Sequence, residues 1–309
     1  MPLFRLTRNV LVQDECIDAS AVDVVAWKGI EGDAAADTSN IGHVVNWFKA
    51  GAEGAAVQAM TARTMRLAAS YSGDLLKPSL VPRLIGCVAH DEPGELAAGF
   101  FAAPPLERTV LDVGTFRVAR PLPLLFDILE SGARAADPSG FLVFTNSDIC
   151  LMPHFYRAVQ AMLMRGVDCL IINRRTVSSL ESYGANPELA MTEVGNRHPG
   201  LDCFVFPAAW VAEFTRSDAC AGAGWVMRSL LYNLVAKSKR MLILRDAHLT
   251  YHFGDDKPWA DESLSDYDAF NLQQARTVLD RLAGDSGRRD VLAAFCAAHR
   301  EPLQPGTLQ

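Results

Sequence analysis

The stretch Phe-Leu-Val-Phe-Thr-Asn-Ser-Asp-Ile, residues 141–149, decides how the middle of this chain folds. Residues 141–145 are apolar strand formers, and the polar tripeptide Asn146-Ser147-Asp148 follows them directly. Such a run predicts a short buried strand that ends in a carboxylate. Ligands of open α/β folds bind at the carboxyl ends of the strands. Asp148 is therefore a candidate to hold a metal ion against a phosphorylated ligand.

Asp148 has a second interpretation, in which its carboxylate only caps the next helix. Proline prefers the first position of a helix, so Pro153 places the cap near Met152. Asp148 then lies four residues upstream of the cap, too far to accept the first free amides of the helix. The spacing therefore favours a ligand role over capping.

Length and composition restrict the possible functions. The chain has 309 residues, half of them hydrophobic, which is enough for one large domain or two small ones. A net charge of −7 argues against a broad nucleic-acid-binding face. No apolar run approaches the length of a membrane span, and the acidic first twenty residues predict no secretory signal. The seven cysteines occur singly and predict reduced core residues in a cytoplasmic protein.

Short apolar runs alternate with amphipathic segments from about residue 84 onward. This alternation predicts an α/β fold with a mostly parallel sheet flanked by helices. The predicted strands cover residues 84–89, 109–113, 141–145, 169–172, 202–206 and 241–245, and the predicted helices cover 121–136, 153–165, 207–214, 224–237, 266–283 and 289–299.

The two ends of the chain are predicted to be helical extensions of this α/β domain. Residues 1–82 form the first extension, in which 22–27 could be a strand, a helix starts at Ser39 or Asn40, and helix resumes over 55–69. The α/β domain then covers 83–260, and C-terminal helices over 261–309 pack on it. Within the domain, residues 181–200 are irregular, and a loop of that length is usually functional or mobile.

The order of elements over about residues 83–259 resembles the GT-A fold of glycosyltransferases that use nucleoside-diphosphate sugars. In that family a strand ends in an Asp-x-Asp-like tripeptide whose last Asp binds Mn²⁺ or Mg²⁺, and the metal holds the donor diphosphate. Asn146-Ser147-Asp148 stands at that place, with Asn for the first Asp. The resemblance implies that Asp148 ligates the metal, with Asn146 beside it and Ser147 near the nucleotide.

A second motif supports the same resemblance. His252-Phe-Gly-Asp-Asp-Lys257-Pro-Trp259 is similar to the His-x-x-Gly-x-x-Lys-Pro-Trp of the glycogenin-like branch, with one residue fewer before the glycine. The resemblance implies that His252 is the second metal ligand, that Lys257 pairs with the donor phosphates, and that Trp259 shields or stacks on the donor. The ordinary alternatives are a structural histidine, a solvated surface charge and a core aromatic.

The acid–base group is harder to assign. Inverting members of the family place a carboxylate at the start of the helix that corresponds to 224–237, and residues 223–226 contain none. Asp202, which opens a predicted strand, is the best remaining candidate for a general base, with an Asx turn after Pro-Gly as its alternative. The contacts implied on the donor side are His90, Asp91, Asp112, Arg117 and Arg120.

The resemblance implies a metal-dependent, hexosyltransferase-like glycosyltransferase. It would move a sugar from a nucleoside-diphosphate sugar to a carbohydrate or another hydroxyl acceptor, by inversion or retention. A nucleotidyltransferase also uses a sheet-edge acid and a metal, but the acidic residues 91–95 would repel a triphosphate. A non-catalytic nucleotide-sugar-binding protein is the other alternative, favoured by Asn146 and by the missing acid at residues 223–226.

Overall fold

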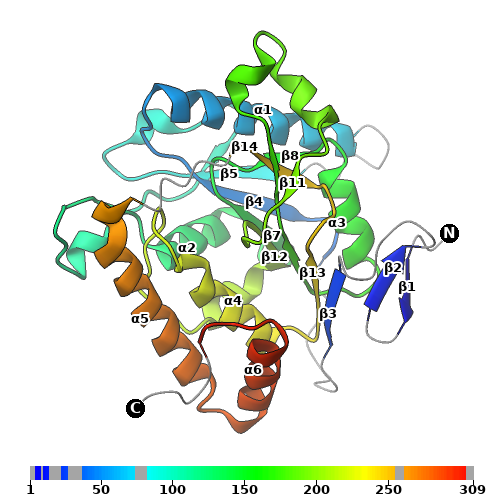
Figure 1. The fold of residues 1–309 in the computed structure, drawn as a ribbon, viewed down its shortest axis with the longest axis vertical. Coiled ribbons are helices and arrows are strands. Elements are labelled where there is room, and N and C mark those ends of the chain that lie inside the picture. The colour runs from blue at the N-terminus through cyan, green and yellow to red at the C-terminus, as the bar shows by residue number, and fades with distance from the viewer. Residues whose placement is uncertain are drawn as a thin grey trace. The chain divides into compact units, whose positions relative to one another are not determined.

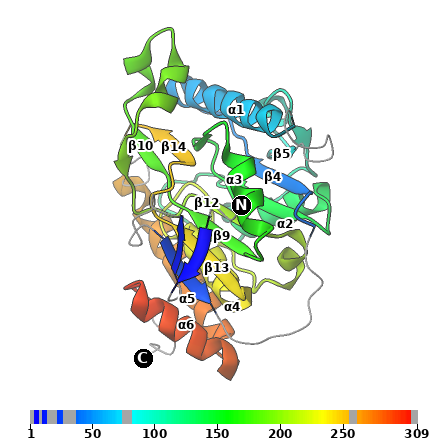
Figure 2. The same ribbon diagram turned by 90° about the vertical axis from the view of Figure 1, so that its right-hand side faces the viewer.

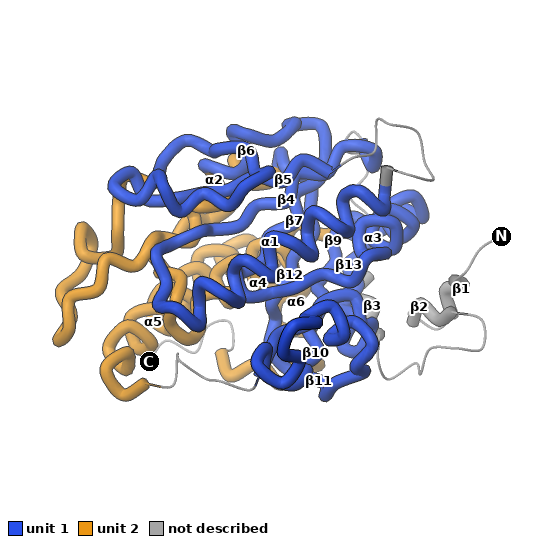
Figure 3. The backbone as a smooth tube through the Cα atoms, turned by 90° about the horizontal axis from the view of Figure 1, so that it is seen from above, with its two compact units in different colours: residues 1–105, 131–209, 239–256 blue, residues 106–130, 210–238, 257–309 orange. Residues whose placement is uncertain are grey.

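The computed structural model describes residues 37–73, 82–254 and 261–303, and the backbone alone of residues 4–7, 10–13 and 22–26. The chain divides into two compact units, and each unit takes several separate segments of the sequence (Figure 3). Unit 1 comprises Met1–Pro105, Ser131–Ala209 and Lys239–Asp256, and unit 2 comprises Leu106–Glu130, Trp210–Ser238 and Lys257–Gln309. In the described residues, no helix is both long and apolar enough to cross a membrane.

Unit 1 is built on an eight-stranded sheet, as far as the described residues go, with the order β3-β13-β9-β12-β7-β4-β5-β6. Four of its seven pairings are parallel, which confirms the predicted α/β fold with a mostly parallel sheet. The strands are β3 (Val22–Ala26), β13 (Arg240–Leu244), β9 (Cys169–Ile172), β12 (Cys203–Pro207), β7 (Phe141–Thr145), β4 (Ile41–Asn46), β5 (Arg83–Cys87) and β6 (Phe101–Ala102); β1 (Phe4–Thr7) and β2 (Val10–Gln13) pair separately.

Strands at the centre of this sheet are buried on both faces, as their continuous apolar runs predict. Every residue of β7 is buried. Helices α1 (Ala52–Gly73) and α3 (Phe155–Leu163) contribute to the core on one face, together with alternate strand residues such as Val143 and Val205 (Figure 2). On the other face, Gly132 of α2 (Leu125–Ala135) approaches so closely that an added Cβ would lie 2.5 Å from a methyl carbon of Val44.

A fully buried histidine sits inside the first of these core layers. Nδ1 of His43 lies 2.7 Å from the Tyr156 hydroxyl, and Nε2 lies 2.9 Å from the Thr145 hydroxyl. Both partners are hydroxyls, which can either donate or accept, so a neutral imidazole satisfies both contacts. Burial lowers the pKa of His43 from 6.5 to about 3, so the ring is neutral near pH 7.

A second, smaller sheet in unit 1 has the order β11-β10-β14-β8. Its strands are β11 (Asn196–Arg197), β10 (Arg175–Val177), β14 (Thr250–Phe253) and β8 (Cys150–Leu151). Strand β8 starts two residues after Asp148, and it pairs antiparallel with β14 so that Thr250 faces Leu151 and Tyr251 faces Cys150. Extending this register places His252 opposite Ile149, next to Asp148. The small sheet thus brings together two segments that are far apart in the sequence.

Unit 2 is mainly helical in its described part (Figure 1). Helix α4 (Val226–Lys237) packs against α5 (Ser265–Leu282) and α6 (Ser286–Ala298). The buried side chain of Asn271 accepts from the Cys220 amide at 2.9 Å and donates to the carbonyls of Cys220 and Gly224 at 3.0 Å. Over both units, the described residues form the 3₁₀ helices η3 (Pro93–Glu95), η4 (Val110–Asp112), η5 (Leu180–Tyr183), η6 (Pro187–Thr192), η7 (Ala208–Glu213) and η9 (Glu262–Leu264).

Two sequence-based predictions of secondary structure are wrong. The helix predicted from Ser39 or Asn40 is strand β4, because a short continuous apolar run fits a fully buried strand as well as a helix face. The α/β unit therefore begins before residue 83, inside the predicted extension. The strand predicted over 109–113 is the 3₁₀ helix η4, closed by a capping box between Thr109 and Asp112.

Candidate functional site at the carboxyl edge of the central sheet

The side chains of Asp148 and His252 lie together in unit 1. Nε2 of His252 is 3.3 Å from Oδ2 of Asp148. Nδ1 of His252 is 3.0 Å from the carbonyl oxygen of Gly254, which can only accept a hydrogen bond. In a neutral ring this contact places the proton on Nδ1 and leaves Nε2 as an acceptor that faces the carboxylate, whereas both nitrogens of an imidazolium donate. Two acceptors that face each other at this distance need a proton or a cation between them.

Asp148 is ionised in this environment and keeps one oxygen free of protein partners. Burial raises the pKa of its carboxyl, but the hydrogen bond and charge of His252 and the charge of Arg174 outweigh burial, so the pKa lies below its ordinary value. The side chain is 43 % exposed. Its Oδ1 is nevertheless covered and has no hydrogen-bond partner in the described structure. A buried carboxylate oxygen without a donor is suited to a metal ion or a bound ligand.

These two side chains fit a hard divalent cation that accepts one imidazole. Carboxylate oxygen suits Mg²⁺ and Mn²⁺, and imidazole nitrogen is tolerated better by Mn²⁺. In the described part of the chain, no group of three or more His, Cys, Asp or Glu side chains could enclose a metal. Oxygen atoms of a bound ligand and of water could fill the remaining positions around such a cation.

The other two residues of the tripeptide shape the turn that carries Asp148. The amide of Ile149 donates to the Asn146 carbonyl at 3.3 Å, which closes the turn after β7. Ser147 is buried, and its hydroxyl accepts from the Gln58 amide of helix α1 at 3.4 Å. Ser147 thus fixes the turn against α1, whereas the side chain of Asn146 is half-buried beside Asp148.

Asp202 reaches the same edge of the sheet from strand β12. Cys203 pairs with Thr145 of β7 and with Ile172 of β9, so the residue before Cys203 lies where β7 and β9 end. Asp202 is buried, and its Oδ1 accepts from Nη1 of Arg174 at 2.8 Å. The general-base role of Asp202 stays a prediction, and this ion pair is a contact that the sequence did not predict.

Asn173, Arg174 and His198 also lie at this edge, and no sequence motif indicated them. Asn173 follows β9 directly and Arg174 comes next, with its Nη2 3.3 Å from Nε2 of His198. The signals that could have found them are the pair of arginines at the end of a buried strand and the histidine four residues before Asp202.

His90 and Asp91 also lie at this end of the sheet. They follow β5 in a turn, and both are exposed. Strand β5 is parallel to β4, and β4 is parallel to β7, so their carboxyl ends share one edge. A contact between these two residues and a nucleotide stays a prediction.

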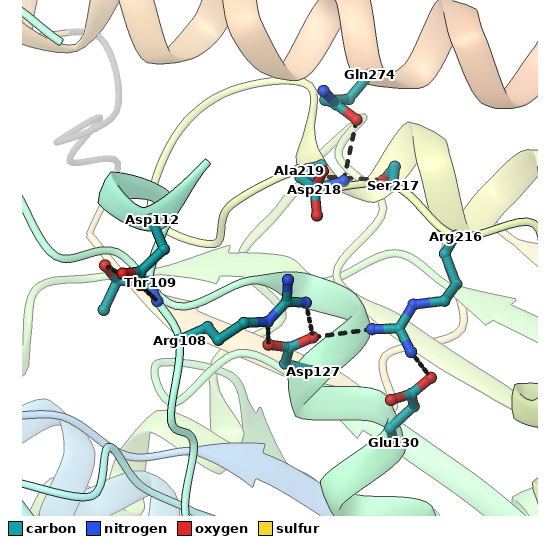
Figure 4. Close-up of polar contacts among 10 residues, drawn as sticks. All are labelled: Arg108, Thr109, Asp112, Asp127, Glu130, Arg216, Ser217, Asp218, Ala219 and Gln274. Carbon is teal, nitrogen blue, oxygen red and sulfur yellow. Dashed lines mark hydrogen bonds and ion pairs between the residues drawn. The ribbon is translucent and has the colours of Figure 1, made fainter. Parts of the chain in front are cut away.

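The other donor-side candidates belong to unit 2, where they stabilise local structure. Asp112 accepts from the Thr109 amide at 2.7 Å in the capping box of η4 (Figure 4). The backbone amide of Arg117 donates to Asp266 at 2.7 Å, and Nη2 of Arg120 donates to Ser263 at 2.7 Å. Both arginines therefore hold the segment that leads into α5.

A separate ion-pair group lies near Asp112 in unit 2. Asp127 accepts two hydrogen bonds from Arg108, at 3.0 and 2.7 Å, and one from Arg216 at 2.9 Å (Figure 4). Arg216 also pairs with Glu130. The charges in this group balance one another, which indicates a structural role. Lys257 and Trp259 lie outside the described residues.

No family model matches this chain, and no curated protein matches it either. Solved structures match at low identity. S. aureus TarS 1–349 in complex with UDP-GlcNAc is 11 % identical, with 84 % of this chain and 72 % of that chain covered and a TM-score of 0.45. Rv0371c from Mycobacterium tuberculosis H37Rv is 14 % identical, with 76 % and 97 % covered and a TM-score of 0.34.

A third solved structure is 4-diphosphocytidyl-2C-methyl-D-erythritolsynthase from Anaerococcus prevotii DSM 20548. It is 11 % identical, with 78 % of this chain and 100 % of that chain covered and a TM-score of 0.39. Because all three TM-scores lie below 0.5, these likenesses do not decide the function of this chain.

Proposed function

We propose that this chain is a metal-dependent glycosyltransferase that moves a sugar from a nucleoside-diphosphate sugar to an acceptor hydroxyl. One observation carries the proposal: the carboxylate of Asp148 and Nε2 of His252 face each other at 3.3 Å, at the carboxyl edge of the sheet. Asp148 follows the buried strand β7, as in the family that the Asn-Ser-Asp tripeptide and the His-x-Gly-x-x-Lys-Pro-Trp motif resemble, and His252 lies within β14.

Asp148 and His252 would hold Mn²⁺ or Mg²⁺ through Oδ1 or Oδ2 and Nε2. When bound, such an ion supplies positive charge that stabilises a departing diphosphate. The hydrogen bond from Nδ1 to the Gly254 carbonyl orients the His252 ring. Lys257 and Trp259 are proposed to contact the donor phosphates and the donor itself.

The proposal is tested by incubating the protein with a panel of nucleoside-diphosphate sugars, with and without Mn²⁺, and measuring release of nucleoside diphosphate. We expect metal-dependent release that falls to background in Asp148→Ala and in His252→Ala. Asp137→Asn is a matched control, because Asp137 is an exposed carboxylate just before β7, at the opposite end of the same strand. Equal activity in Asp148→Ala and in the control would contradict the proposal.

Two other outcomes would identify the alternative functions. Tight binding of a nucleotide sugar without any release or transfer would indicate a non-catalytic binding protein. Release of pyrophosphate from a nucleoside triphosphate and a sugar phosphate would indicate a nucleotidyltransferase.

A further inference from the structure

Three side chains at the sheet edge in unit 1 have buried polar atoms without partners. Oδ1 of Asn173, Nε of Arg174 and Oδ2 of Asp202 are all covered, and none has a hydrogen-bond partner in the described structure. The three residues are only 1 %, 7 % and 7 % exposed. Because Cys203 pairs with Ile172, Asp202 faces Asn173 across the ends of β12 and β9. Leaving such groups unpaired is costly, so a bound ligand or water that pairs with them would be stabilised here.

His198 cannot supply the missing hydrogen bonds. Nη2 of Arg174 lies 3.3 Å from its Nε2, and the amide of Gly200 lies 3.0 Å from its Nδ1. Both of these groups are donors, whereas a neutral imidazole has one acceptor nitrogen and an imidazolium has none. If Nδ1 accepts from Gly200, it has no proton for Oδ2 of Asp202, which lies 3.6 Å away. At least one group therefore stays unsatisfied in either tautomer.

The unpaired atoms define the chemistry of a ligand that would complete the site. Oδ2 of Asp202 and Oδ1 of Asn173 need donors, and Nε of Arg174 needs an acceptor. A hydroxyl group is both a donor and an acceptor, so neighbouring hydroxyls of a sugar match this set. Arg174 is paired with Asp202 at 2.8 Å, so these three side chains together carry no net positive charge for an anion. A carboxylate ligand would instead meet two acceptor oxygens and be repelled.

We propose that Asn173, Arg174 and Asp202 bind the hydroxyl groups of an uncharged sugar and thereby select neutral sugars over uronic acids. This inference rests on the proposed function, and it makes Asp202 a specificity-determining residue and not the general base. The side chain of His198 contacts Arg174 and Asp202 and is 18 % exposed, more than theirs at about 10 %. His198 is therefore the most exposed member of this group, and the proposed ligand would approach the three residues from its side.

Binding isotherms in Mn²⁺ test this selectivity on the unmodified protein. The probes are UDP, UDP-glucose and UDP-glucuronate, with GDP, GDP-mannose and GDP-mannuronate as the guanosine set. The comparison is made with the nucleotide, uridine or guanosine, whose free diphosphate binds to the protein. For that nucleotide, we expect the neutral nucleotide sugar to bind about ten- to a hundredfold more tightly than the nucleotide uronate. Equal affinities for the two would overturn the inference, and no variant has to fold for this comparison.

Asp202→Asn then separates sugar binding from acid–base catalysis. We expect it to weaken binding of the neutral nucleotide sugar about ten- to a hundredfold, while the Kd of the free diphosphate is unchanged, as in the control Asp137→Asn. A general base would leave that Kd intact and lower kcat about 10²–10⁴-fold, which would overturn the inference. If no diphosphate binds to the unmodified protein, the proposed function fails, and this inference fails with it.

Discussion

Replacing His43 by Gln should remove much of the acid sensitivity of unit 1. His43 is fully buried between Tyr156 and Thr145, and its folded pKa is about 3 against 6.5 for an exposed imidazole. Between these two values the unfolded chain binds a proton that the folded chain refuses. His43 therefore does not lower the free energy of unfolding above pH 6.5, and it lowers this free energy progressively as the pH falls toward 3.

The size of the effect follows from the two pKa values. Each unit of difference corresponds to about 1.36 kcal/mol, so His43 should cost about 2 kcal/mol of folding free energy when the pH falls from 7 to 5. Gln carries both a donor and an acceptor for the two hydroxyls but does not titrate. Between pH 7 and pH 5, the free energy of unfolding should thus fall less in His43→Gln than in the unmodified protein. Other titrating groups are the same in both proteins, so their contribution cancels in this comparison.

Urea unfolding followed by tryptophan fluorescence measures this difference, because Trp47 belongs to the same core as His43's neighbour Tyr156. His90→Gln serves as the control, since His90 is exposed in the turn after β5. The control should keep the full pH dependence of the unmodified protein. Parallel pH profiles for His43→Gln and the unmodified protein would refute the reasoning.

Three further changes test the packing and the polar contacts. Asp127→Asn removes the carboxylate that two half-exposed arginines share, so unfolding in urea should show a loss of about 1 kcal/mol that shrinks at high salt. Gly140→Ala would place a Cβ 2.4 Å from the backbone oxygen of Asn40, and should lower the free energy of unfolding by about 1–3 kcal/mol. Asn271→Ala leaves the buried amide of Cys220 without its acceptor, and should lower the free energy of unfolding in urea by more than about 2 kcal/mol. An unchanged free energy of unfolding would show that this amide finds another partner.

Local patterns predicted some of the strands that the site depends on, because their signals are contained in a few residues. The apolar run before Asn146 predicted a short buried strand, and its polar ending placed Asp148 at the sheet edge. Residues 169–172 were likewise predicted with the bounds that the structure has. The same reasoning wrongly predicted a helix over the residues of β4 (Ile41–Asn46), because their apolar side chains match both a helical face and a fully buried strand.

Contacts that depend on strand pairing were beyond the sequence. The approach of His252 to Asp148 follows from the pairing of β14 with β8, and the resemblance of the motifs suggested it where periodicity could not. The ion pair between Arg174 and Asp202 follows from the pairing of β12 with β9, for which no motif gave a signal. Asp112 shows the opposite case, in which a carboxylate that seemed to lie in a strand caps a 3₁₀ helix.

Titration of Mn²⁺ by electron paramagnetic resonance tests most directly whether Asp148 and His252 share one divalent cation. In the presence of UDP or GDP, the unmodified protein should remove one equivalent of Mn²⁺ per chain from the free signal. Asp148→Ala and His252→Ala should each weaken this binding strongly, while Asp137→Asn should bind as the unmodified protein does. Undiminished Mn²⁺ binding in both Asp148→Ala and His252→Ala would contradict the metal site.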